Sequence, residues 1–228
     1  MSRKWILVLL VCIALICSGC SIRNPRTAGQ LPEGAVLFLP EGDETIPYVA
    51  VSEDYGGAVL LLRQEILPED LPFASDDSAY YAESSVDAYL SGEFLRQFPQ
   101  QLREQICDTE IEICCRFPDN SRTECISRRA FLLSATEVGI DLAMVTPEGT
   151  PLAWFRSRAH HPALQEGNPA DWWLRSAYTA DRGLAWHIQA NGTLGGSGVW
   201  IPSGIRPAIC LPRFFPVQKA ENGFVPRA

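Results

Sequence analysis

The sequence has little of what catalytic, nucleic-acid-binding or membrane-spanning chains need. Only 3 of its 228 residues are histidine, and 19 Lys and Arg stand against 27 Asp and Glu, which gives a net charge of −8. With no basic stripe, the chain has no electrostatic basis for binding nucleic acid. No apolar run approaches the roughly 20 residues that a transmembrane helix requires. The histidines also predict no shared metal site, because His160 and His161 are adjacent and would diverge in extended backbone, while His187 stands alone.

The N-terminal residues have the pattern of an export signal. Arg3 and Lys4 precede an apolar run, Trp5 to Ile16, and small residues follow it. The next four residues, Cys17-Ser18-Gly19-Cys20, resemble the lipobox of bacterial lipoproteins. That resemblance implies cleavage after Gly19 and fatty acylation, including palmitate, at Cys20. An ordinary signal peptide cleaved near Gly19 is the alternative.

This interpretation divides the chain into four parts. We expect a signal peptide at 1–19, a polar tether at 20–33, one domain at 34–215 and a tail at 216–228. Removal of the signal takes away two basic residues and makes the mature chain more acidic. The acyl chains on Cys20 would therefore hold the domain on the extracytoplasmic face of the cell membrane, with the lipid bilayer as a partner.

Five cysteines follow Cys20, and export would permit disulfides among them. They are Cys107, Cys114, Cys115, Cys125 and Cys210. Two expected strands, 110–117 and 123–133, flank a turn at 118–121, so Cys114 is expected opposite Cys125 in a possible cross-strand disulfide. Two adjacent cysteines do not have the usual zinc-ligand spacing, and no metal or other cofactor is expected.

Short apolar segments predict strands at both ends of the domain, with helices between them. The expected strands are Ala35–Leu39, Ile46–Val51, Ala58–Arg63, Trp172–Arg175, Gly183–Gln189 and Ile205–Leu211. A helix is expected after a cap at Ser84 or Ser85, with an interruption at Gly92, and a second one after Pro99. Ser134 and Glu137 have capping-box spacing, which predicts a third, short helix. This arrangement indicates an α+β domain.

Four segments between Ala35 and Pro212 together resemble a domain-of-unknown-function family that is common in surface proteins of Gram-positive gut bacteria. They are Ser85–Phe94, Phe131–Ser134 with Glu137, Trp172–Ser176 and Gly204–Ala208, the last two matching W-W-L-R-S and G-V-R-P-A signatures. The resemblance implies a C-type-lectin-like domain with short mixed and antiparallel strands and two short helical regions. This fold is of the kind shared with formylglycine-generating enzymes, and the resemblance implies no known activity.

Two arginines lie among apolar residues in expected strands, which predicts partly buried guanidinium groups. Glu137 is the expected partner of Arg175, and Arg206 is the second such arginine. Either arginine could instead bind an anionic ligand.

Aromatic residues supply the candidate binding surface. Trp154, Trp173, Trp186 and Trp200, with Arg175, are the candidate ligand-binding residues, because exposed aromatic faces bind sugar rings or protein partners. The alternative is that these rings fill the core. We expect a non-catalytic domain that binds an extracellular glycan or protein. An enzyme on a formylglycine-generating scaffold and a structural component of the envelope are the alternatives.

Overall fold

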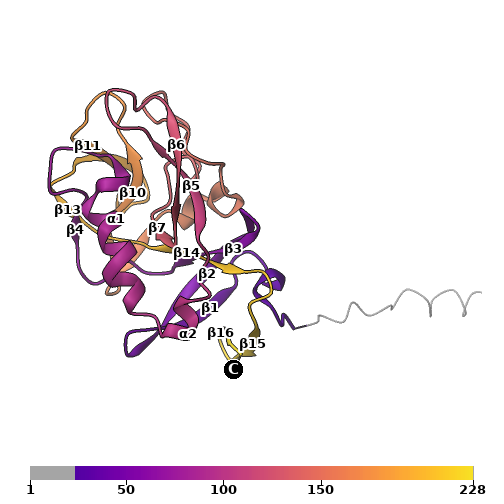
Figure 1. Ribbon diagram of the computed structural model, residues 1–228. Coiled ribbons are helices and arrows are strands. Elements are labelled where there is room, and N and C mark those ends of the chain that lie inside the picture. The colour runs from indigo at the N-terminus through magenta and orange to yellow at the C-terminus, as the bar shows by residue number, and fades with distance from the viewer. Residues whose placement is uncertain (1–23, 228) are drawn as a thin grey trace, which may run out of the picture.

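A seven-stranded mixed sheet joins the first and last strands in a computed structural model that describes residues 24–227. Its strand order is β15-β16-β1-β2-β3-β14-β7 (Figure 1). The strands are β1 (Val36–Glu41), β2 (Glu44–Tyr55), β3 (Ala58–Arg63), β7 (Ala130–Phe131), β14 (Ala208–Pro212), β15 (Val217–Ala220) and β16 (Gly223–Pro226). The last third of the chain thus returns to pair with the first.

The first three strands, which were expected from the sequence, pair in order as a meander. Gly42 turns the chain between β1 and β2 with φ of +61°, and Gly56 and Gly57 do the same between β2 and β3 with φ of +60° and +87°. Positive φ at both central residues, as at Gly56 and Gly57, suits a tight hairpin turn, because the twist of such a turn matches that of the strands. All six residues of β3 are buried, as befits a strand between two others with both faces covered.

Smaller sheets cover the remainder of the domain. The strands of the three-stranded sheet are β10 (Trp172–Ala177), β11 (Leu184–Ile188) and β12 (Leu194–Gly198). The two-stranded sheets pair β5 (Thr109–Cys114) with β6 (Thr123–Arg128), β4 (Leu71–Pro72) with β13 (Pro202–Ser203), and β8 (Ala163–Gln165) with β9 (Asn168–Ala170). In Figure 1 the β5–β6 hairpin and β10–β11 lie together in the upper half, with β1, β15 and β16 below.

The helices are short. They are α1 (Ser85–Tyr89), which continues as the π-helical turn η3 (Leu90–Phe94), α2 (Gln100–Arg103), and the 3-10 turns η1 (Ala28–Gln30), η2 (Tyr81–Glu83), η4 (Ala153–Arg156) and η5 (Arg158–His160). Ser84 caps α1, since its Oγ accepts from the Asp87 N–H at 3.0 Å. Gly92 lies within this wider π turn. The expected interruption of the helix at Gly92 is therefore wrong. Over residues 24–227, no helix is both long and apolar enough to cross a membrane.

The expected α+β, C-type-lectin-like fold is wrong. Residues 24–227 are mostly β, with 40% of them in strands and 14% helical, around a large mixed sheet. One reason is that the predicted capping box does not start a helix. Ser134 and Glu137 make both reciprocal bonds, at 3.0 and 2.9 Å, yet Gly139 then adopts φ of +80° and leaves the helical region. The segment therefore remains a turn.

Both expected boundaries of the domain also need correction. The predicted tail at 216–228 contains β15 and β16, and β16 pairs in parallel with β1. The predicted tether at 20–33 already contains folded residues, because Thr27 forms a β-bridge with Pro216 and Ala28 is fully buried. The signal peptide at 1–19 and Cys20 lie outside the described residues.

The expected Cys114–Cys125 disulfide is also wrong. In the β5–β6 pairing Cys114 lies opposite Thr123, and Cys125 lies opposite Glu112. Diagonal neighbours of this kind lie roughly 7–8 Å apart, beyond the usual Cα separation in disulfides of about 4.4–6.8 Å. All five cysteines in the described part of the chain are free.

Candidate functional site

The first candidate, Arg175, lies in the core and not at a surface. Its guanidinium forms the expected pair with Glu137, with Nη1 to Oε2 at 2.6 Å and Nη2 to Oε1 at 2.8 Å. Nε and Nη1 also donate to the carbonyls of Glu112 and Leu132 at 2.9 and 2.8 Å. Both side chains have no exposed surface, so this pair organises the core. Arg175 cannot reach a ligand.

A second buried carboxylate, Glu148, completes this polar cluster. One of its oxygens accepts from the Cys114 N–H at 2.6 Å, and the other accepts from the Ser176 hydroxyl. Burial raises the pKa of the Glu148 carboxyl, while the Arg175 charge lowers it. The Tyr55 hydroxyl donates to Glu137 at 2.5 Å from the edge of the cluster. These groups satisfy one another, which is what a buried polar network requires.

Most of the predicted aromatic binding residues are likewise internal. Trp172 and Trp173 are both fully buried, and Trp186 is buried against Tyr178. Trp172 and Trp173 point to opposite faces of β10, and neither reaches the surface because every residue of this strand is buried. Trp173, Trp186 and Arg175 therefore cannot form a binding surface.

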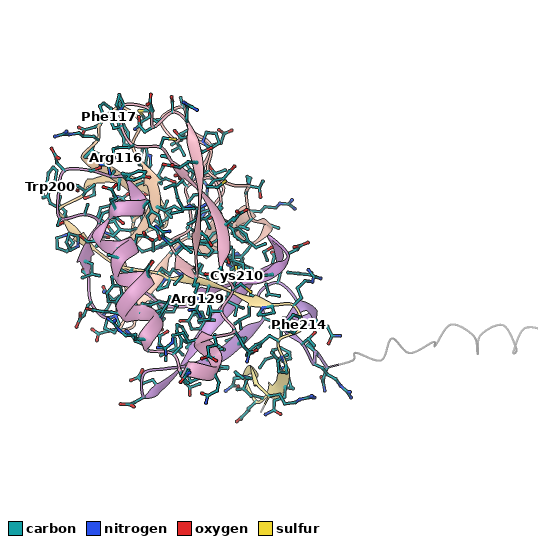
Figure 2. The ribbon with its side chains drawn as sticks, viewed as in Figure 1. Arg116, Phe117, Arg129, Trp200, Cys210 and Phe214 are labelled. Carbon is teal, nitrogen blue, oxygen red and sulfur yellow. The ribbon has the colours of Figure 1, made fainter. Side chains whose placement is uncertain are left out.

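The other two candidates, Trp154 and Trp200, are accessible but lie apart. Trp200 is 62% exposed and packs over Gly183 and Gly198. It stands at the left edge of the molecule in Figure 2, across the view from the exposed Phe214. Trp154 is half-buried and packs on Gly34 at the other end of the sequence. The expected single aromatic patch is absent from the described surface.

Trp154 instead forms one wall of a cavity of about 370 Å³. Its indole stacks on the His160 ring with centroids 3.6 Å apart and planes 6° from parallel, and His160 Nδ1 lies 2.5 Å from the Trp154 carbonyl oxygen. The apolar residues of the wall are Val36, Val49, Pro162, Ala163 and Leu164. The volume is within the range of small-molecule sites, about 300–1,000 Å³.

Arg206 is the cationic residue of this cavity. Its Nε donates to the Arg63 carbonyl at 3.0 Å, its Nη2 donates to the Gln64 carbonyl at 3.2 Å, and the guanidinium lies 5.1 Å from the Trp172 ring centroid. Its buried Nη1 has no hydrogen-bond partner among the described residues. Burial lowers the pKa of Arg206 to about 10, so the group remains charged at neutral pH. An unpartnered buried donor is costly, and an acceptor that reached Nη1 would relieve that cost.

Two further polar side chains, Gln64 and Glu65, also line the cavity. Together with Arg206 and the Trp154–His160 stack, they offer an amide, a carboxylate and a guanidinium beside a flat aromatic surface. This combination can bind a hydroxylated ring that carries a negative group. Arg206 and Trp154 could be singled out from the sequence, whereas Gln64 and Glu65 could not, because no local pattern marks them.

A second cavity, of about 570 Å³, lies on the other side of the same loop. Phe155 and His161 line it, whereas their neighbours Trp154 and His160 line the first cavity. Its lining includes Arg156 and Arg158 but no buried polar atom without a partner, among the residues described. The Arg206 cavity is therefore the stronger candidate. No cluster of three or more metal-ligating side chains was found between residues 24 and 227.

Comparison with protein families gives one match. A family model described as "Domain of unknown function (DUF6273)" matches residues 56–213. The chain belongs to this family. Comparisons with curated proteins and with solved structures gave no match.

The DUF6273 match includes the polar part of the candidate site but not all of its walls. Gln64, Trp154 and Arg206 lie within residues 56–213, whereas Gly34 and Val36 precede them. The cavity is therefore completed by Val36 of β1 and Val49 of β2, which lie outside the matched region.

Proposed function

We propose that this protein is a lipoprotein, anchored through acylated Cys20 on the extracytoplasmic face of the membrane, whose DUF6273 domain binds an extracellular glycan without catalysis. It would belong with the surface proteins of Gram-positive bacteria that its W-W-L-R-S and G-I-R-P-A strands resemble. The cavity beside Trp154 is the proposed binding site. A protein ligand is the competing outcome.

The observation that carries this proposal is the meeting of Arg206 and Trp154 at one cavity. Arg206, whose buried Nη1 has no hydrogen-bond partner, and Trp154, whose indole stacks on His160, line the same cavity. Aromatic faces bind the apolar faces of sugar rings, and a guanidinium binds carboxylate through charge-assisted hydrogen bonds. We therefore favour a sugar that carries a carboxylate group.

The amino-terminal pattern supports the proposed location. Arg3 and Lys4, the apolar run and the Ser18-Gly19-Cys20 sequence are those of an acylated export signal. The acidic chain has no electrostatic attraction to an anionic bilayer, so acyl chains are needed to hold it there.

The direct test is a glycan-array screen with residues 21–228, followed by calorimetry on the best ligand. Trp154→Ala should weaken binding by roughly tenfold, which corresponds to about 1.4 kcal/mol and is within the contribution of an aromatic contact. Trp200→Ala is the matched control, because it removes an exposed indole outside the cavity and should leave affinity unchanged. Circular dichroism would establish that both variants are folded.

A second arm tests the role of Arg206. The carboxylate sugar should bind wild-type protein at least tenfold more tightly than its neutral methyl ester, because only the carboxylate accepts a charge-assisted bond. Arg206→Lys should reduce that preference. Equal binding of acid and ester, equal losses in the two tryptophan variants, or capture of a protein and no glycan would each contradict the proposal.

A further inference from the structure

Two cysteines far apart in the sequence, Cys107 and Cys210, meet where the segment after α2 lies against β14. The backbone N–H of Cys107 donates to the Cys210 carbonyl at 2.9 Å. Antiparallel residues that exchange two such bonds have Cα atoms about 5.5 Å apart, so this one bond indicates a separation near the range of about 4.4–6.8 Å that disulfides require. Figure 2 labels Cys210 near the middle of the view.

Neighbouring contacts hold the Cys107 segment in this place. Arg129 Nε donates to the carbonyl of Ile106 at 3.2 Å, and the Thr109 hydroxyl donates to the Cys107 carbonyl at 3.3 Å. Burial raises the pKa of Cys210 to about 12, while a hydrogen bond from Thr109 lowers it and the Cys107 thiol raises it further. The backbones of Cys107 and Cys210 are thus held next to each other before a disulfide bond forms.

We propose that Cys107 and Cys210 form a disulfide bond when the folded domain meets a disulfide oxidant. This pairing takes the place of Cys114–Cys125, which the strand register excludes. In the cell, the disulfide would form in an oxidising compartment, which requires the proposed export. The reaction of the two thiols with an oxidant does not depend on that export.

Access to the pair is through Cys107. This residue is half-buried and lines a cavity of about 650 Å³ with Tyr55, Asp108 and Pro212, whereas Cys210 is fully buried. The Cys107 thiolate attacks the oxidant disulfide and releases one thiol. Cys210 then loses its proton and attacks the Cys107 sulfur, releasing the second thiol. Two protein thiols are oxidised by two electrons, and one disulfide is reduced to two thiols.

The environment of Cys107 predicts how this reaction depends on pH. Burial, followed by the negative charge of Asp108, raises the pKa of the Cys107 thiol above its usual value. Only the thiolate attacks, so the rate of the first step should rise about tenfold per pH unit between pH 7 and 9.

The test uses the full chain with Cys12, Cys17, Cys20, Cys115 and Cys125 each replaced by serine, so that of the 8 cysteines only Cys107, Cys114 and Cys210 remain. Oxidised glutathione is the probe, and peptide mapping by mass spectrometry is the readout. We expect a Cys107–Cys210 linked peptide. The melting temperature should also rise on the order of 5–10 °C, and dithiothreitol should reverse this, because the bond closes a long loop.

Matched variants separate this result from nonspecific oxidation. Adding Cys107→Ser should abolish both the linked peptide and the rise in melting temperature, whereas adding Cys114→Ser should preserve both. A stable glutathione adduct on Cys107 in folded protein, or linkage of Cys107 to any other cysteine, would overturn the proposal. Neither result depends on whether the domain binds a glycan.

Discussion

At the residue scale, Arg175 shows how this core accommodates charge. Three of its nitrogens donate to the Glu137 carboxylate and to two backbone carbonyls, so no donor nitrogen is left without an acceptor. The Ser134 N–H and the Tyr55 hydroxyl donate to the same carboxylate. The pair therefore joins β10, the turn after β7 and the end of β2 at one point.

Removal of the arginine alone should be severe. Arg175→Met leaves the Glu137 charge buried without its cation, which costs about 3–5 kcal/mol of unfolding free energy. Denaturant unfolding would measure this cost. Arg182→Met is the control, because the Arg182–Asp77 pair is more than half exposed and should contribute less than about 1 kcal/mol.

A double variant tests the reason for that loss. Glu137→Gln together with Arg175→Met removes both charges, so it should be less destabilised than Arg175→Met alone. If Arg175→Met were no worse than Arg182→Met, the buried pair would not organise the core.

At the element scale, the cavity depends on how η4 packs against the turn before β1. Gly34 has φ of +84°, and a Cβ at this position would lie 2.7 Å from Cζ3 of Trp154. Only glycine adopts this backbone and also leaves room for the indole. The position of Trp154 is thus set by a residue 120 positions earlier in the chain.

Gly34→Ala should therefore displace Trp154 and weaken ligand binding. The clash adds to the backbone strain of an alanine at positive φ, which costs about 1–2 kcal/mol. Gly42→Ala is a close control, because Gly42 also has positive φ but nothing lies within 4 Å of the added Cβ. Indole fluorescence and calorimetry should change for Gly34→Ala and remain unchanged for Gly42→Ala. Equal effects of the two substitutions would count against a positioning role.

At the scale of the whole molecule, both ends of the described chain are tied into the large sheet. Thr27 bridges Pro216, and β16 pairs with β1. An anchor at Cys20 would thus be joined to the folded domain by only a few residues, and the domain would lie close to the membrane surface.

Loss of the acylated cysteine should release the protein. In the native host, Cys20→Ala should move the chain from the membrane fraction to the soluble or secreted fraction, because it removes the proposed attachment site of the acyl chains. Immunoblotting of the fractions measures this shift, with Cys17→Ala as the matched control that should stay at the membrane. A wild-type chain with an intact Met1 in the cytosolic fraction would contradict the proposed location.

Local sequence patterns determined the elements that depend on neighbouring residues. Apolar runs predicted β1, β2 and β3. Ser84 caps α1 as expected, and Arg175 forms the expected pair with Glu137. The capping box is the instructive failure. Its side-chain hydrogen bonds are present, but Gly139 leaves the helical region and Glu137 pairs with Arg175 in the core. The segment is therefore a turn, and the α+β expectation does not hold.

Only the tertiary structure decided what lies beside what. The order of the seven-stranded sheet, the burial of Trp173 and Trp186, the cavity between Trp154 and Arg206, and the meeting of Cys107 with Cys210 all join residues distant in sequence. Such contacts depend on which loops close and which faces are covered, and a change of register by two residues was enough to separate Cys114 from Cys125. Local propensities do not contain that information, because it arises from packing the whole chain at once.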